Sequence, residues 1–188
     1  MTMALRILLV AALQTAALVY MIVDRAGVLS SATVITLKVK PVDPSDMFRG
    51  DYVILNYEIS NLETSALAGD DEPYYRGGYA FVTLEQRDGV WTPIAVNASM
   101  LSSRAPGTVV LRGQVETVSS NSGGAPPSLR LTYGIESFFV PQGQGKPIED
   151  ERQKGDLTAE IAIDNDGRAA IKSLRRTDGT VLSVDGVF

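Results

Sequence analysis

The sequence contains no cysteine and no histidine among its 188 residues. Without cysteine, disulfide bonds, thiolate metal sites and cysteine nucleophiles are excluded. Without histidine, the chain lacks the commonest general base near neutral pH and the commonest zinc ligand. These absences exclude most familiar classes of enzyme, and we expect neither a metal site nor a cofactor.

Basic residues are few as well, since 17 lysines and arginines stand against 22 aspartates and glutamates, for a net charge of −5. A protein that binds nucleic acid needs a basic face to neutralise phosphates, so no nucleic-acid partner is expected. The length suits one globular domain, or one domain plus an anchor.

One long hydrophobic run is present, from Ile7 to Val23, and only Gln14 and Thr15 interrupt it. As a helix it would cover roughly 25 Å, the short end of a membrane span. We expect residues 1–25 to form an uncleaved signal-anchor. A cleaved signal peptide and a buried core helix are the alternatives; secretory apolar regions are usually shorter, and a core helix would carry a polar face.

The charges around this run bear on its orientation. Arg6 favours an N-terminus inside the cell, whereas Arg25, Lys38 and Lys40 weaken that bias. We expect residues 26–188 to form one domain outside the cytoplasm, on the periplasmic side of a bacterial inner membrane.

After the anchor the pattern changes to short alternating segments bounded by glycine, proline and aspartate, which is typical of β-strands. The expected strands are Ala32–Val39, Asp51–Ile59, Tyr79–Gln86, Val90–Asn97, Val109–Val118, Ser128–Ile135, Thr158–Ile163, Arg168–Leu174 and Thr180–Val184. Two turns of helix are expected over Asn61–Ala68 and a short helix over Pro147–Lys154. The sequence thus predicts a mainly β fold, an antiparallel sandwich or partly closed barrel of about eight or nine strands.

Parts of the sequence repeat. Phe48–Tyr52 resembles Leu111–Val115, and Leu55-x-Tyr57-x-Ile59 resembles Leu131-x-Tyr133-x-Ile135. Two related halves built from one β unit would explain this echo, and so would chance similarity between strands of like composition.

The most specific segment is Gly50-Asp51-Tyr52-Val53-Ile54-Leu55-Asn56-Tyr57, which matches letter for letter the pattern that names the GDYXXLXY family. The surroundings also resemble that family, with Val42-Asp43-Pro44 before the motif and Tyr133-Gly134-Ile135-Glu136 and Phe139-Val140-Pro141 after it. The chain departs from the family pattern at Gln142, where an acidic residue is usual. The resemblance implies a membrane-anchored bacterial protein of unestablished activity that accompanies a multi-pass integral membrane protein.

Two interpretations of the motif stand side by side. In the structural one, a tight turn at Gly50 and Asp51 feeds a central strand. In the functional one, charged and aromatic groups form a recognition surface, for which tyrosine is well suited. The expected interface residues are Arg49, Asp51, Tyr52, Tyr57, Tyr133, Glu136 and Phe139, with Gly50, Leu55 and Gly134 as structural members of the motif.

An enzymatic alternative comes from the same segment. Ser45-Asp46-Met47 followed by Gly50-Asp51-Tyr52-Val53 is similar to the layout of membrane-anchored signal peptidases, in which a lysine activates the serine. No lysine lies between Lys40 and Lys146, so that partner is missing. A cell-envelope hydrolase with a degenerate serine site or an unrecognised carboxylate pair remains the alternative function.

Asp164-Asn165-Asp166-Gly167 resembles the start of a calcium loop but lacks the glutamate that would complete it, so we expect a hairpin turn there. The function expected from the sequence is a membrane-anchored binding or accessory module for an integral membrane protein, without catalysis. A purely structural subunit that pairs through an exposed sheet edge is a third possibility.

Overall fold

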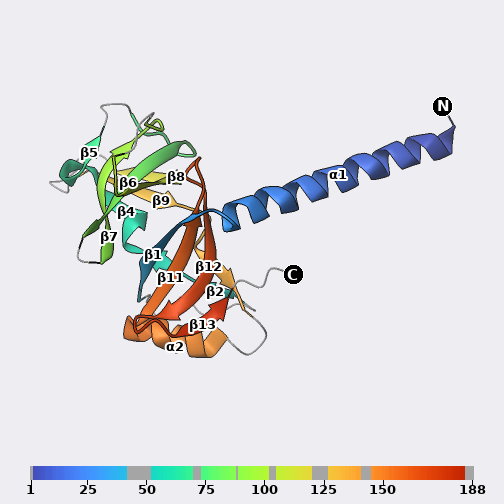
Figure 1. The fold of residues 1–188 in the computed structure, drawn as a ribbon. Helices are drawn as coiled ribbons and strands as arrows, with labels where there is room; N and C mark the ends of the chain where they lie inside the picture. Colours follow the sequence, from blue (N-terminus) through green and yellow to red (C-terminus); the bar gives the residue numbers. More distant parts are fainter. Residues whose placement is uncertain are drawn as a thin grey trace.

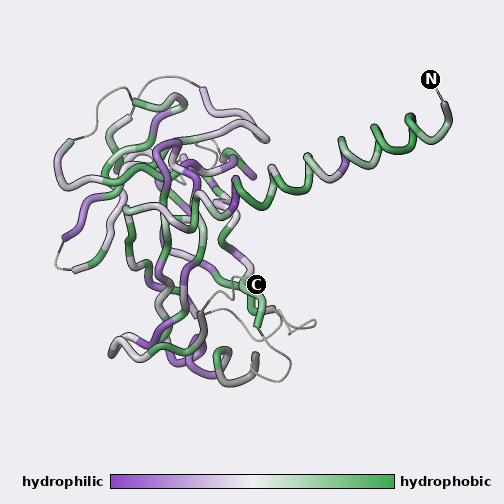
Figure 2. The backbone as a smooth tube through the Cα atoms, turned by 45° about the vertical axis from the view of Figure 1, so that its right-hand side comes forward, coloured by the Kyte–Doolittle hydropathy of each residue, from purple (hydrophilic) through white to green (hydrophobic). Residues whose placement is uncertain are grey.

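A computed structural model of the chain describes residues 2–41, 52–69, 73–87, 89–101, 105–119, 127–140 and 145–184. The first element is helix α1 (Met3–Leu29), 27 residues long, which leaves the β domain as a single rod with the N-terminus at its far tip (Figure 1). Its tube is mostly green or pale in Figure 2, with few hydrophilic turns. The helix is long and apolar enough to cross a membrane.

The expected anchor, residues 1–25, corresponds to most of α1, but the helix continues into the domain. Its last turn contacts strands of the domain, and Val28 is buried there. No separate linker divides helix from domain, because strand β1 begins only a few residues after Leu29.

The domain is mainly β, as the sequence predicts. Its strands are β1 (Thr33–Lys40), β2 (Tyr52–Ile54), β3 (Asn56–Tyr57), β4 (Asn61–Glu63), β5 (Ala68–Gly69), β6 (Tyr79–Arg87), β7 (Val90–Asn97), β8 (Thr108–Ser119), β9 (Ser128–Thr132), β10 (Ser137–Phe139), β11 (Leu157–Ile163), β12 (Ala169–Arg176) and β13 (Val181–Val184). The helical elements of the domain are the 3-10 turns η1 (Glu58–Ser60) and η2 (Thr64–Ala66) and the helix α2 (Gly145–Lys154).

These strands form two larger sheets and a small one. One sheet has the order β13-β12-β11-β1-β3, the other β4-β9-β8-β6-β7-β5, and β10 pairs with β2. In Figure 1 the sheet with β6, β7 and β8 lies in the upper part of the domain, and β11, β12 and β13 lie in the lower part beside α2. All the pairs except the short β5–β7 contact are antiparallel.

Three sequence-based expectations need correction. The strand expected over Asp51–Ile59 is divided into β2, β3 and the 3-10 turn η1, because β2 pairs with β10 and β3 with β1. Asn61–Ala68 is not two turns of helix but β4, η2 and β5, because β4 pairs with β9 and β5 with β7, and these pairings outweigh local helix propensity. The strand expected over Ser128–Ile135 ends at Thr132, because Gly134 adopts φ of +76° and turns the chain. The expected hairpins β6–β7 and β11–β12 and the helix α2 are confirmed.

The echo in the sequence corresponds to a repeat in the strand pairing. Tyr133 follows Tyr57 by 76 residues, and the same shift carries β4 onto β10. Asn61 of β4 pairs with Arg130 of β9. Moving Asn61 forward by this shift gives Ser137, and moving Arg130 back by it gives Ile54. Ser137 and Ile54 are in fact partners in the β10–β2 pair. The two halves therefore exchange strands around a pseudo-twofold axis.

The larger hairpins follow the same rule. β1 pairs with β11 as β8 pairs with β6, so each half lends its first strand to the hairpin of the other half. Each hairpin also has one register shift, after Thr83 in β6 and after Glu160 in β11. The pairing matches β8 with β1, so Leu111–Val115 corresponds to β1 and not to Phe48–Tyr52, of which residues 48–51 lie outside the described residues.

Candidate functional site

Two tyrosines, one in the motif and one in its echo, bind each other's segment. The Tyr57 hydroxyl donates to the Ile135 carbonyl oxygen at 2.9 Å, and the Tyr133 hydroxyl donates to the Ile59 carbonyl oxygen at 2.6 Å. Both rings are buried in the core. Burial raises the pKa of both phenols, and the nearby Glu136 carboxylate raises it further, so both remain protonated donors. These reciprocal bonds hold the two halves together.

Glu136 fixes the turn that carries Tyr133. Its carboxylate accepts the backbone N–H of Tyr133 at 2.6 Å and that of Gly134 at 2.9 Å. Its backbone carbonyl accepts the N–H of Leu55, in the motif, at 2.8 Å. The expected structural members Leu55 and Gly134 thus lie at one junction between the halves, with Leu55 fully buried.

The remaining expected interface residues are distributed unevenly. Arg49 and Asp51 lie outside the described residues, as do Gly50 and the candidate nucleophile Ser45. The backbone of Tyr52 pairs with Phe139 across β2 and β10. The side chain of Phe139 is 77% exposed, unlike the rings of the two buried tyrosines. The role of the expected interface residues in binding a partner stays a prediction.

Sequence reasoning missed Arg152 in α2. Its side chain is 2% exposed, and its Nη1 donates to the Ile54 carbonyl oxygen in β2 at 2.6 Å. Helix α2 is thereby fastened to the motif strand. An arginine in a short, strongly charged helix is typical of a solvated surface, so no signal in the sequence indicated this contact.

A cavity of about 360 Å³ opens beside Tyr133, where the domain meets α1. Its lining combines residues of α1, β6, β8, β9, β12 and the loops at Gly134 and Arg168. These residues are Arg25, Tyr79, Arg112, Gln114, Thr132, Tyr133, Gly134, Glu136, Arg168 and Ala169. We call this space the Tyr133 cavity. Three predicted motif residues, Tyr133, Gly134 and Glu136, therefore line it, and its three arginines were not anticipated.

The arginines are held in different ways. The guanidinium of Arg112 lies over the Tyr79 ring, 4.7 Å from its centroid. Arg25 donates from Nη1 to the Ala169 carbonyl oxygen at 3.2 Å. The Nη1 of Arg168 lies 2.7 Å from the Asp24 carboxylate and its Nε 2.7 Å from that of Asp164.

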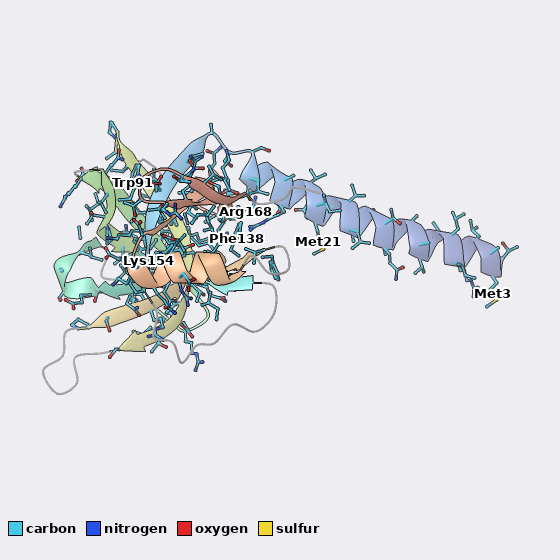
Figure 3. All side chains as sticks on the ribbon, turned by 90° about the horizontal axis from the view of Figure 1, so that it is seen from below. Met3, Met21, Trp91, Phe138, Lys154 and Arg168 are labelled. Carbon is cyan, nitrogen blue, oxygen red and sulfur yellow. The ribbon has the colours of Figure 1, made fainter. Side chains whose placement is uncertain are left out.

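These ion pairs join the end of α1 to the β11–β12 hairpin, and Figure 3 shows Arg168 near the domain end of the helix. Hydrogen bonds to Asp24 and then Asp164 raise the pKa of Arg168, so it is charged at any ordinary pH. Burial acts to raise the pKa of Asp164, but hydrogen bonds from the backbone and side chain of Arg168 outweigh it, and the pKa is lowered. The junction between helix and domain is thus a fixed, charged contact.

A second, much smaller cavity of about 10 Å³ lies at the matching place in the other half. Lys38, Tyr57 and Trp91 line it where Arg112, Tyr133 and Ala169 line the larger one. The strand pairing supports this match. Trp91 pairs with Gln86, the third residue after the register shift in β6, and Ala169 pairs with Ile163, the third residue after the register shift in β11. We call these triplets the Tyr57 corner (Lys38, Tyr57, Trp91) and the Tyr133 corner (Arg112, Tyr133, Ala169).

In the described part of the chain, no three aspartates or glutamates gather where they would hold a metal ion. The fold and this site define a mainly β protein of two intertwined halves, with an N-terminal helix able to span a membrane and an arginine-lined cavity at its base.

The chain belongs to the GDYXXLXY protein family, whose model matches residues 14–174. This match covers most of the chain and confirms the resemblance carried by the motif. No curated protein and no solved structure matches the chain.

Proposed function

We propose that this protein is a membrane-anchored accessory module that binds an integral membrane partner. The observation that carries the proposal is the fixed junction between α1 and the domain. Asp24 pairs with Arg168, Arg25 binds the Ala169 carbonyl, and Val28 is buried. A domain joined to its anchor in this way keeps one orientation relative to the membrane, which favours binding of a partner that is itself fixed in the membrane.

A polar residue in the helix adds support. Gln14 lies near the middle of the apolar run and is exposed, and among the described residues none forms a hydrogen bond with its side chain. The adjacent Thr15 is satisfied inside the helix, because its hydroxyl donates to the Ala11 carbonyl oxygen at 2.9 Å. Polar side chains within membrane helices commonly form hydrogen bonds to a neighbouring helix, so Gln14 is a candidate contact.

On the domain, the proposed contact surface is the motif edge formed by β2 and β10. Phe139 supplies a large exposed aromatic group there, and aromatic side chains are frequent anchors of protein interfaces. Arg49, Asp51 and Tyr52 belong to the same proposed surface by sequence. We further propose that the domain lies on the periplasmic side of the inner membrane, which the charge of Arg6 supports.

The test is capture of the full-length tagged protein from native membranes in mild detergent, followed by mass spectrometry. The wild-type chain is expected to retain a multi-pass membrane protein in stoichiometric amount, and a chain reduced to the helix is not. Phe139→Ala is expected to lower recovery while leaving the thermal melt unchanged. Recovery of the same proteins by the helix alone would contradict a role for the domain.

Gln14→Leu has a matched control in Thr15→Val, which alters the neighbouring residue of the same helix. Loss of an interhelical hydrogen bond worth about 1 kcal/mol weakens binding several-fold, whereas Thr15 has no such bond to lose. Equal effects of the two substitutions would argue against Gln14 as a contact.

A further inference from the structure

We propose that the Tyr133 cavity binds a phosphate ester whose alcohol part carries free hydroxyl groups. Its volume of about 360 Å³ suits a small ligand or a lipid headgroup. Its lining includes four charged side chains, an amide and a hydroxyl beside its apolar surface, and an apolar ligand would leave these polar groups unsatisfied. This ligand is distinct from the protein partner proposed above.

Two cationic groups enter the cavity from different elements, Arg25 from α1 and Arg112 from β8. Within the part of the chain that the structure describes, neither forms an ion pair with a carboxylate. Stacking on Tyr79 holds Arg112 in place, and the bond to the Ala169 carbonyl holds Arg25. Both arginines line one cavity, so a bound phosphate could neutralise both through charge-assisted hydrogen bonds.

The remaining charges do not cancel this attraction for an anion. Arg168 also lines the cavity, but Asp24 and Asp164 pair with it at 2.7 Å and balance its charge, so it adds little to the attraction. The one carboxylate in the wall is Glu136, which already accepts two backbone N–H groups. Beside the ion-paired Arg168, the wall carries two arginines without a carboxylate partner among the described residues and one carboxylate, so an excess positive charge remains, and phosphate is a matching group.

The same wall offers acceptors for hydroxyl groups. Gln114 and Thr132 contribute amide and hydroxyl oxygens, and Glu136 has further lone pairs on its carboxylate. These groups lie in one cavity with the arginines, which favours a polyhydroxy ester such as a glycerol phosphate over inorganic phosphate alone.

The position of Arg25 indicates a membrane source for the ligand. Arg25 follows the apolar run by two residues, at the depth of the lipid headgroups if α1 spans the bilayer. This source rests on the proposed anchoring, whereas the binding chemistry does not. A soluble glycerol phosphate carries the same groups, so the two sources need separate measurements.

The experiment uses the full chain in nanodiscs of phosphatidylcholine, with and without phosphatidylglycerol, and detects bound lipid by native mass spectrometry after release into detergent. A parallel arm adds soluble glycerol 3-phosphate to the phosphatidylcholine sample. We expect preferential retention of phosphatidylglycerol. Binding of the soluble ester alone also supports the site and assigns it to a free ligand. Equal retention of the two lipids without binding of the soluble ester would overturn the proposal.

The variants test the residues. Arg112→Gln removes one charged donor and is expected to weaken retention about tenfold, the loss of one charge-assisted hydrogen bond. Arg130→Gln is the matched control, because Arg130 pairs with Asn61 on an exposed surface and does not line the cavity. Ala169→Trp tests whether the open volume is needed for binding, because the indole would occupy it. If the Ala169→Trp chain does not fold, Arg25→Gln is used as the second variant instead. Equal loss in Arg130→Gln would overturn the assignment.

The outcome is separable from that of the proposed function. Capture of the membrane partner by Arg112→Gln alongside lost lipid retention would show two independent sites. Absence of any captured partner, with selective retention of phosphatidylglycerol intact, would overturn the accessory role and leave the ligand site standing.

Discussion

The Tyr57 corner and the Tyr133 corner occupy the same place in the two halves of the molecule and differ in what fills them. In both, a buried tyrosine reaches across to a carbonyl of the other half. At the Tyr57 corner the indole of Trp91 leaves about 10 Å³ of space, and at the Tyr133 corner Ala169 leaves about 360 Å³. A large side chain at a matched position is thus one difference between the packed corner and the cavity.

The backbone beside each tyrosine differs as well. Val39 of β1 pairs with Tyr57, whereas the strand β8 presents Gly113 to the Tyr133 ring. The turn after Tyr57 is the 3-10 turn η1. The turn after Tyr133 is made by Gly134, and the Glu136 carboxylate accepts the backbone N–H of Tyr133 there. Of the two corners, the Tyr133 corner adjoins helix α1 in the described residues, through Arg25 and Arg168. Figure 3 shows Trp91 well away from that helix.

The largest effect is expected from Gly113→Val, which gives the Tyr133 corner the residue found at Val39. A Cβ at Gly113 would lie 3.0 Å from Tyr133 Cε1 and 3.1 Å from Leu131 Cβ. Tyr133 is held by its hydrogen bond to the other half, so it cannot simply move away. We expect the free energy of unfolding to fall by about 3 kcal/mol. Chemical denaturation of the full chain in a nonionic detergent measures it.

The control for that substitution is Gly27→Ala in α1, where an added Cβ meets no atom within 4 Å. It is expected to leave stability unchanged or to raise it slightly, because alanine favours helix. A Gly113→Val chain as stable as this control would mean that the two corners tolerate the same packing.

The second-largest effect is expected from the hydrogen bond that the tyrosine of each corner donates to the other half. Tyr57→Phe leaves the Ile135 carbonyl without its donor, and Tyr133→Phe does the same to the Ile59 carbonyl. Each loss is expected to cost about 2 kcal/mol, because a buried acceptor is left unsatisfied. Thermal melts of both variants and of the double variant check this. If the halves are held as a pair, the double variant departs from additivity; a large cost at one corner alone would break the equivalence.

The sequence predicted the strands of both large hairpins because Asp88-Gly89 and Asn165-Asp166-Gly167 are strong turn signals between alternating segments. The repeated Leu-x-Tyr-x-Ile pattern drew attention to both tyrosines, but as members of a recognition surface and not as a buried pair that binds across the two halves. The sequence did not predict β4, β5 and the short strand β10, because segments of two or three residues become strands only through partners distant in the chain.

The cavity was beyond sequence reasoning for a related reason. Arg25, Arg112 and Arg168 lie in three separate segments, and only the exchange of strands between the halves brings them to one wall. Taken alone in the sequence, each of these arginines is typical of a solvent-exposed side chain. Their neighbours Tyr133, Gly134 and Glu136 were found because the motif and its echo drew attention to them, not because their spacing indicated a cavity.

The smallest expected effect is a pH dependence beside the Tyr133 corner that the Tyr57 corner does not share, because Arg168 stands at the position that Val90 holds in the other half. The pKa of Asp164 is lowered in the folded state from its ordinary value of 3.8. A lowered carboxyl pKa stabilises the fold above that ordinary value, and the contribution disappears as the pH falls through the folded pKa. Arg168, with a raised pKa, stays charged throughout and adds no dependence in this range.

Asp164→Asn tests that contribution, because the amide oxygen retains the acceptor for the backbone N–H groups of Asp166 and Arg168, whereas the charge and the acceptor for Arg168 Nε are lost. For this partly buried pair we expect a difference from wild type of up to about 1 kcal/mol at neutral pH. The difference should stay constant from pH 7 to about 5 and shrink below about 4. Melts of both chains across this range measure it; because Glu151 and Glu160 also have lowered pKa values and are present in both chains, their acid sensitivity cancels in the comparison. A difference that persists unchanged into strong acid would show that the charge of Asp164 does not stabilise the junction between helix and domain.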